Sequence, residues 1–275
     1  MRAFERRLEF GVLKLPTRKH VMKPSFKLAL ACVPLALVAA CGGGDDVADR
    51  LDLANPTVRF VHASPLAPNV SLYRNQGTAS VVQTQATNVA YKSATNYYDI
   101  DLSAADWVVK TAVGDVTVGS ENIDPKRGNK YTIVALPASS TTSALYVIND
   151  PYNKPLTSTS TKLRVMNASF NAANIDVYMT GLNADISAAA PLIAATAYKT
   201  SGPKSGDDSQ NIPGGTYQIR VTTAGTKTVL FSGQLTFGNN QDVLILTVPD
   251  AAASGGVSAL VKVEGTGAAT SIPVL

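Results

Sequence analysis

The sequence has very little cysteine and histidine for a chain of 275 residues, with two of each. Both cysteines, Cys32 and Cys41, come before residue 42. Beyond that point there is no thiol for a disulfide, a thiolate metal cluster or a cysteine nucleophile. The one histidine beyond that point is His62, which excludes a structural zinc site built from several histidines and cysteines. We therefore expect no metal and no cofactor.

The chain also lacks the clustered positive charge that binds nucleic acid. Its net charge is +4, but 8 of the 24 basic and 2 of the 20 acidic residues fall within residues 1–40. The remainder therefore holds 16 basic and 18 acidic residues, a net charge of −2. The basic pair Lys126-Arg127 lies in a Pro/Gly turn. We exclude nucleic acid as a partner.

The apolar stretch near the start is too short to cross a bilayer as a helix. It covers 13 residues, Leu28–Ala40, whereas a spanning helix needs about 20. It follows Lys23 and Lys27 and ends in small residues, which is the layout of a secretory signal peptide. We predict a signal peptide over residues 1–40. Its start is either Met1, with an extended basic region, or Met22, which we favour.

The end of this stretch, Val38-Ala39-Ala40-Cys41, resembles the bacterial lipobox. The resemblance implies cleavage before Cys41, a diacylglycerol thioether on its sulfur and an acylated (palmitate-type) amino terminus, because several acyl chains anchor a protein stably. Gly42 to Asp46 indicate a flexible tether, and the absence of aspartate at position 42 favours the outer membrane. The alternative is an ordinary signal peptide whose cleavage site precedes a cysteine.

The remaining chain contains an internal repeat. The segment VRFVHASPLAPNVSLY, Val58–Tyr73, aligns with LRVMNASFNAANIDVY, Leu163–Tyr178. Two later matches follow in the same order, AYK at residues 90–92 and 197–199, and YTIVALP with VLILTVP, which end at Pro137 and Pro249. Three ordered matches indicate a duplication with a period suited to a domain of about 100 residues.

Each copy is rich in short runs of β-branched and aromatic residues separated by Gly, Pro and Asn turns. This pattern predicts an all-β fold of two tandem immunoglobulin-like β-sandwiches. Trp107 is predicted in the first core, with Tyr217 as its counterpart. The expected boundaries are a tether at 41–56, a first sandwich at 57–150, a semi-extended linker at 151–161, a second sandwich at 162–264 and a tail at 265–275.

The segment at Val58–Tyr73 resembles the bacterial family known as domain of unknown function 4397. The matching residues are Val58, Arg59, His62, Ala63, Ser64, Pro65, Ala67, Pro68, Val70 and Tyr73. Leu66 and Ser71 depart, because the family usually has aspartate there. The second copy keeps Arg164, Ala168, Ser169, Ala172, Asp176, Val177 and Tyr178, with Asn167 for the histidine and Phe170 for a proline. The resemblance implies an exported, often lipidated β-domain protein and no particular activity.

No residues form a convincing catalytic set. A hydrolase could use His62 with Ser64, but residues two apart on one strand are poorly placed for proton transfer. We favour a backbone-bonded imidazole, whose role Asn167 could fill because both side chains donate and accept hydrogen bonds. Asp99, Asp101 and the pair Asp207-Asp208 lack the pattern of a calcium loop.

Other signature residues are predicted to be structural, with Arg59 and Arg164 each expected to pair with an acid of its own domain, such as Asp176. Tyrosines at positions 91, 97 and 98 could stack on sugar rings, but aromatic residues in strands are more often core.

The expected function is a non-enzymatic lipoprotein of the cell envelope that binds a protein or polysaccharide through a tandem sandwich. A hydrolase using His62 and a purely architectural spacer are the alternatives. The expected partners are a membrane, through the lipid on Cys41, and an envelope protein or polysaccharide.

Overall fold

The computed structural model describes residues 54–151, 158–265 and 269–275. The predicted signal peptide, Cys41 and most of the tether and linker lie outside these residues. The described residues fall within one compact unit. All their regular elements are strands except one short 3-10 helix, η1 (Thr84–Ala86). Within these residues, no helix has the length and apolar character that a membrane span needs.

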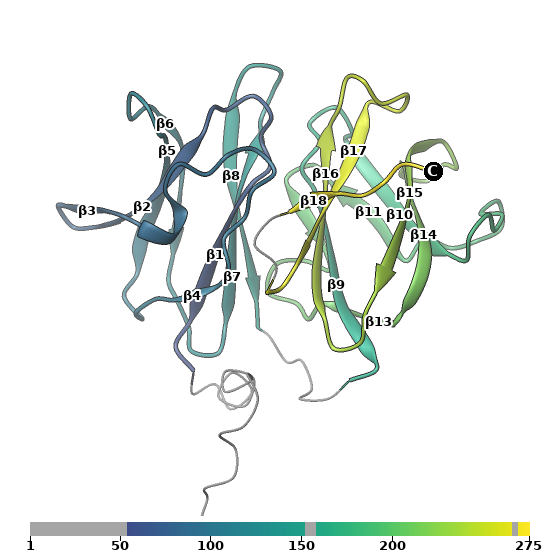
Figure 1. Cartoon of the computed structure of the whole chain (residues 1–275), viewed down its shortest axis with the longest axis horizontal. Helices are drawn as coiled ribbons and strands as arrows, with labels where there is room; N and C mark the ends of the chain where they lie inside the picture. Colours follow the sequence, from purple (N-terminus) through teal and green to yellow (C-terminus); the bar gives the residue numbers. More distant parts are fainter. Residues whose placement is uncertain (1–53, 152–157, 266–268) are drawn as a thin grey trace, which may run out of the picture. The chain divides into compact units, whose positions relative to one another are not determined.

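The first sandwich consists of two four-stranded sheets, with orders β4-β1-β7-β8 and β3-β2-β5-β6 (Figure 1). β1 and β7 pair in parallel, and the other neighbours pair antiparallel. The strands are β1 (Thr57–His62), β2 (Val70–Gln76), β3 (Ala79–Val82), β4 (Tyr98–Asp99), β5 (Ala105–Thr111), β6 (Thr117–Ile123), β7 (Lys130–Pro137) and β8 (Ser143–Asp150).

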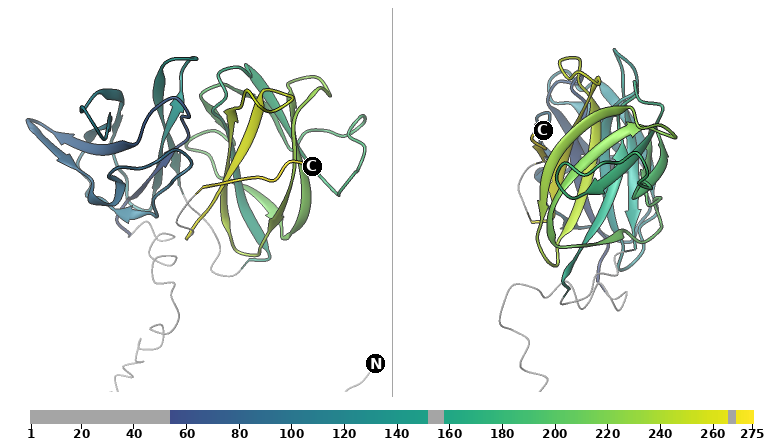
Figure 2. Two further views of the ribbon diagram at one scale, coloured as in Figure 1. Left: turned by 45° about the horizontal axis from the view of Figure 1, so that its top comes forward. Right: turned by 90° about the vertical axis from the view of Figure 1, so that its right-hand side faces the viewer.

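The second sandwich repeats this order, with sheets β12-β9-β16-β17-β18 and β11-β10-β14-β15. β9 and β16 again pair in parallel, and β13 adds to β9. Two further views show the layered sheets (Figure 2). The strands are β9 (Ser160–Asn167), β10 (Asn174–Thr180), β11 (Ile193–Ala197), β12 (Thr200–Gly202), β13 (Gln210–Pro213), β14 (Gly215–Thr223), β15 (Val229–Phe237), β16 (Asp242–Pro249), β17 (Val257–Val263) and β18 (Thr270–Ser271). The all-β sandwich prediction is confirmed.

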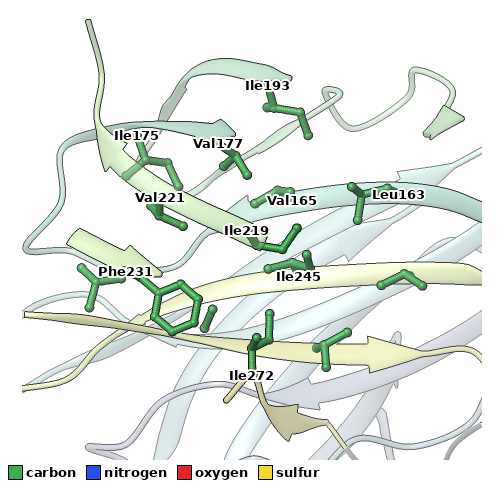
Figure 3. Close-up of a cluster of buried hydrophobic side chains, with 14 of the residues drawn as sticks. Leu163, Val165, Ile175, Val177, Ile193, Ile219, Val221, Phe231, Ile245 and Ile272 are labelled. Atoms are coloured by element: carbon green, nitrogen blue, oxygen red, sulfur yellow. The ribbon is translucent and has the colours of Figure 1, made fainter. Parts of the chain in front are cut away.

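Each sandwich encloses its own apolar core. In the first, Phe60 of β1 and Ile133 of β7 belong to the same cluster as Leu72 of β2. In the second, Val165 and Ile245 of one sheet lie opposite Ile219 of the other (Figure 3). Alternate residues of these strands point inward, as the two-residue period of a strand requires. The hydrophobic term of folding is therefore divided between two similar cores.

Trp107 lies in the first core and is fully buried, as predicted. The counterpart predicted for it is wrong. In the strand register Trp107 pairs with Arg74, the residue after Tyr73, and the residue after Tyr178 pairs with Ile219. Ile219 is therefore the equivalent core residue. Tyr217 is only half-buried at the margin of the second core, where its ring tilts against Phe237. The predicted counterpart, Tyr217, therefore lies two residues before the true one in β14.

A third apolar cluster joins the two sandwiches. It contains Val134 and Leu136 of β7 together with Met166 of β9 and Leu246 of β16. Every residue of β7 is buried, and all but one residue of β9 and of β16. A strand covered on both faces has a continuous apolar run instead of an alternating one. YTIVALP and VLILTVP have that form, so the linker does not join two independent sandwiches.

The described end of the chain lies against the second sandwich. Leu275 N donates to Ser232 O, and Gln234 N donates to Pro273 O. A Cβ atom added at Gly233 would stand 2.5 Å from Pro273 O, so glycine allows the close approach. Residues 269–275 of the predicted tail are therefore docked on the second sandwich.

Candidate functional site

The signature segment of the first sandwich forms the end of β1 and the loop after it. His62 is fully buried. Its Nε2 lies 3.1 Å from Pro68 O, and its Nδ1 accepts a hydrogen bond from Ser64 N. These partners assign the ring proton to Nε2. Burial lowers the pKa of His62, and its bonds to backbone carbonyls oppose this shift. A neutral imidazole therefore ties the loop to the strand.

Asn167 makes the same contacts in the second sandwich. Its Oδ1 accepts from Ser169 N at 3.1 Å, and its Nδ2 donates to Ala172 O at 2.8 Å. Thr247 Oγ1 also donates to Oδ1. The amide thus substitutes for both ring nitrogens.

Ser64 is not positioned as a nucleophile activated by His62. Its Oγ lies 2.7 Å from Ser143 Oγ, and only its backbone N–H reaches the imidazole. A hydroxyl-to-base hydrogen bond is the first geometric requirement of a serine nucleophile. The contacts of the pair therefore lack that requirement.

The second position at which the family usually has aspartate, Ser71 in the first copy and Asp176 in the second, binds a backbone amide. Ser71 Oγ accepts from Asn88 N at 3.0 Å, and Asp176 Oδ1 accepts from Ala195 N at 2.7 Å. Asn88 and Ala195 have positive φ angles, 51° and 49°. The side-chain oxygen thus holds a left-handed residue in place. Among the described residues no group of three or more His, Cys, Asp or Glu could hold a metal ion.

Arg59 and Arg164 point between the sandwiches. Arg164 donates to Pro203 O, Lys204 O and Asp207 O at 2.5–2.6 Å, and its guanidinium lies 3.4 Å from Asp150, an acid of the first sandwich. The expected partner in its own domain is therefore wrong, because Asp176 binds amides elsewhere.

Arg59 donates from Nε to Thr132 Oγ1 at 2.8 Å, and its guanidinium lies 4.6 Å from the centroid of Tyr97. Its Nη1 is buried without a hydrogen-bond partner.

Further charged groups surround these arginines. Lys130 pairs with Glu264 at 2.8 Å. Burial raises the pKa of Asp242 to about 6, with Asp150 contributing in the same direction, and burial lowers the pKa of Lys262 to about 8. One end of the third cluster is thus a mostly buried network of charges, in which each ion depends on its partners because desolvation is costly.

The remaining signature tyrosines lie on the outer sheets. Tyr73 donates to Asp115 at 3.3 Å, and its ring lies 4.7 Å from Lys110 Nζ. Tyr178 accepts from Lys227 Nζ at 3.0 Å, and the same nitrogen lies 4.3 Å from the ring centroid. Both are cation–π pairs on the sheet face that points away from the core, where Tyr73 is half-buried and Tyr178 is buried.

A groove of about 420 Å³ opens where the signature loops of the two sandwiches meet. We call it the signature groove. Tyr91 and Lys92 of the AYK motif line it, as do Asp250 and Ser258 from the β16–β17 region. The loop after β1 contributes Pro65 and Leu66, and the equivalent loop after β9 contributes Phe170.

A larger cavity of about 760 Å³ lies along β11 and β12. Its walls are mainly small residues and backbone, including Ala194, Ala195 and Gly202, with Tyr146 as its only aromatic residue. It contains none of the signature residues, so we take the signature groove as the candidate site.

The groove has no local sequence signal, because the signature segments that form its two walls are offset by 105 residues in the chain. The signal that could have found them is the repeat itself, since equivalent loops of a duplicated fold can face each other. Leu66 is one of the two departures from the signature in the first copy, and Phe170 is one of the two in the second. Both line the groove.

Two solved structures are similar to the chain in fold class. One is a family 41 carbohydrate-binding module from streptococcal virulence factors, described for α-glucan recognition, with 11% identity, a TM-score of 0.22 and coverage of 70% of this chain and 93% of that chain. The other is a family 26 module from Eubacterium rectale Amy13K in complex with maltoheptaose, with 8% identity, a TM-score of 0.23 and coverage of 80% and 97%. At these scores neither likeness carries an argument about function.

No curated protein matches the chain. The family match covers the first sandwich together with β9 and nearly all of β10 of the second, and so includes both signature segments. Residues 56–178 match the model of the family described as Domain of unknown function (DUF4397), the family that the signature residues indicated.

Proposed function

We propose that this protein is a non-enzymatic lipoprotein of the bacterial cell envelope whose paired sandwiches bind a partner at the signature groove. The main support for this proposal is that the signature loops of both sandwiches line one groove. Loops held on a rigid β scaffold are the usual place for binding residues.

The state of His62 supports a binding role over a hydrolase. A general base must reach the proton that it abstracts. Both nitrogens of His62 already contact the backbone, and the Ser64 hydroxyl contacts Ser143. His62→Ala should therefore lower stability without removing an enzymatic activity, and loss of such an activity with the fold preserved would overturn this part of the proposal.

The proposal includes two tandem copies that arose by duplication. Support comes from the shared strand order, the parallel pairs β1·β7 and β9·β16, and the matched contacts of His62 and Asn167.

The anchor part of the proposal rests on the segment Val38–Cys41. Cells carrying the protein or its Cys41→Ser variant would be grown with labelled palmitate and then fractionated. We expect label on the protein with Cys41 and its recovery in the outer membrane. Equal labelling of both proteins, or a soluble unlabelled protein with Cys41 present, would contradict lipidation.

The binding part is tested by photo-cross-linking in cells. A photoreactive residue replaces Leu66, which is 43% exposed in the groove, or Val229, equally exposed on β15, as the matched control. We expect adducts from position 66 and not from position 229. Adducts from neither position would favour the architectural spacer.

A further inference from the structure

We infer that the signature groove binds a neutral saccharide. The inference rests on the proposed binding function and names the chemical class of its ligand. It comes from the side chains of the groove and from the way they are held.

Of the three tyrosines considered for sugar stacking, only Tyr91 lines the signature groove. Tyr97 lies against Arg59 and shares a hydrogen bond with Thr132, and the Tyr98 hydroxyl is buried. Tyr91 is half-buried, and its ring packs edge-on against His62 with centroids 6.2 Å apart. A fixed aromatic ring at a cavity wall offers an apolar surface at little cost in side-chain entropy.

The apolar groups of the groove come from both sandwiches. Leu66 is exposed and Phe170 half-buried, so neither belongs to a core. Together with Tyr91 they make a site that can cover the C–H faces of a ring. Removing such faces from water is favourable in proportion to the area buried.

The polar groups fit a neutral ligand with many hydroxyls. Lys92 brings a positive charge and Asp250 a negative one, so an ion of either sign would meet one repulsive group. Hydroxyls can accept from the ammonium group and donate to the carboxylate. Asp250 Oδ1 accepts from Ala252 N at 3.0 Å, which orients the carboxylate. Asp250 and Tyr91 line the same groove, and the charge of Asp250 adds to burial in raising the pKa of Tyr91.

The backbone fixes the position of this set. Lys92 N donates to His62 O, and Lys92 has a positive φ of 67°. The backbone carbonyl of His62 thus holds the loop that carries two groove residues. A prearranged site loses less entropy on binding.

The test uses the intact lipoprotein purified in detergent. The probes are cellotetraose, maltotetraose and mannotetraose, with tetragalacturonate as the charged comparison and an uncharged peptide of Pro, Tyr and Ser as the peptide arm. Calorimetry and saturation-transfer NMR measure binding. We expect a neutral tetrasaccharide to bind, with dissociation constants of about millimolar because the groove is open.

Two variants locate the binding. Phe170→Ala should weaken it about tenfold through lost apolar contact, and Asp250→Asn should weaken it about fivefold. The asparagine keeps an acceptor for Ala252 N, so the turn is preserved. Val229→Ala and Asp99→Asn are the matched controls and should leave affinity unchanged. If Phe170→Ala fails to fold, Leu66→Ser replaces it.

The outcomes separate the inference from the proposed function. Binding of the peptide alone, or failure of every neutral tetrasaccharide while cross-links from position 66 persist, would overturn the saccharide class and leave the proposed function intact. If Phe170→Ala and Asp250→Asn both bind the saccharide with unchanged affinity, the binding site is not the signature groove. Preference for tetragalacturonate would overturn the neutral charge of the ligand.

Discussion

In the first sandwich an imidazole holds the loop after β1, whereas in the second an amide holds the loop after β9. His62 contacts Ser64 N and Pro68 O, and Asn167 contacts Ser169 N and Ala172 O. In the other sheet of each sandwich, Ser71 of β2 and Asp176 of β10 differ in charge, but each accepts from the amide of a left-handed residue. What the halves share is the hydrogen bonding of the loop, and the side chains that provide it differ.

The largest expected difference between the halves concerns the two buried arginines. Arg164→Ala should lower the free energy of unfolding by about 4 kcal/mol, because it removes a buried cation that pairs with Asp150 and donates to three carbonyl oxygens. Arg59→Ala should cost about 2 kcal/mol, since Arg59 makes one hydrogen bond and one ring contact. Urea unfolding measures both variants.

Arg220→Ala serves as the control for this pair. Arg220 is half-buried and bonds only neutral oxygens, of Thr180 and Gln218, so its loss should cost about 1 kcal/mol. If Arg59→Ala and Arg164→Ala lower the free energy of unfolding equally, the two arginines contribute equally to the stability of the charged network.

The next difference concerns the loop ties. Asn167→Ala should cost about 3 kcal/mol, because a fully buried amide leaves several groups unsatisfied. His62→Ala should cost about 2 kcal/mol, but His62→Asn only about 1 kcal/mol, because the amide can restore the contacts and leaves a smaller void. Thermal and urea unfolding test the order. A His62→Asn variant no more stable than His62→Ala would break the equivalence of the two loops.

The halves should also differ in their response to pH. Burial lowers the pKa of His62 below its ordinary value of 6.5, so the unfolded chain takes up a proton first and stability falls as the pH drops below 6.5. Burial raises the pKa of Asp242 from 3.8 to about 6. The folded protein then holds the proton longer, and stability falls as the pH rises through that interval.

Unfolding curves between about pH 4 and pH 8 separate these two contributions. The His62→Asn variant should lose the decline on the acid side of 6.5, and Asp242→Asn should lose the decline between about 4 and 6. An unchanged pH profile in either variant would contradict its assignment.

The smallest expected difference concerns the left-handed residues. Ala195→Gly should stabilise the protein by about 0.5 kcal/mol, because relief of the strained φ exceeds the entropy cost of glycine. Asn88→Gly should change stability little, since asparagine tolerates this conformation. Both side chains are exposed, so packing does not enter. Destabilisation by Ala195→Gly would show that the methyl group has a role of its own.

Local pattern was enough to predict the fold of each half. Alternation in β2 and β5, the turn residues and the repeat gave the two sandwiches and the buried Trp107. It was not enough to place Ile219, because counterparts in shifted strands follow from register and not from residue type. The continuous apolar runs of β7 and β16 indicate that both faces of these strands are buried. Such a run does not identify which element covers the second face.

The candidate site was less predictable than the fold. The structural reading of His62 followed from its two-residue spacing to Ser64 and from the asparagine in the second copy. Phe170 and Asp250 had no local signal, since their place in the groove depends on contact between loops far apart in the chain. The partners of Arg164 were missed for the same reason.

The cluster that contains Val134, Leu136, Met166 and Leu246 bears on what happens when the chain is cut. Cleavage of the chain between β8 and β9 would leave two fragments, each of which carries one half of this buried apolar cluster. Each fragment alone would expose that apolar face to water, so we expect the two to remain associated without a peptide bond between them.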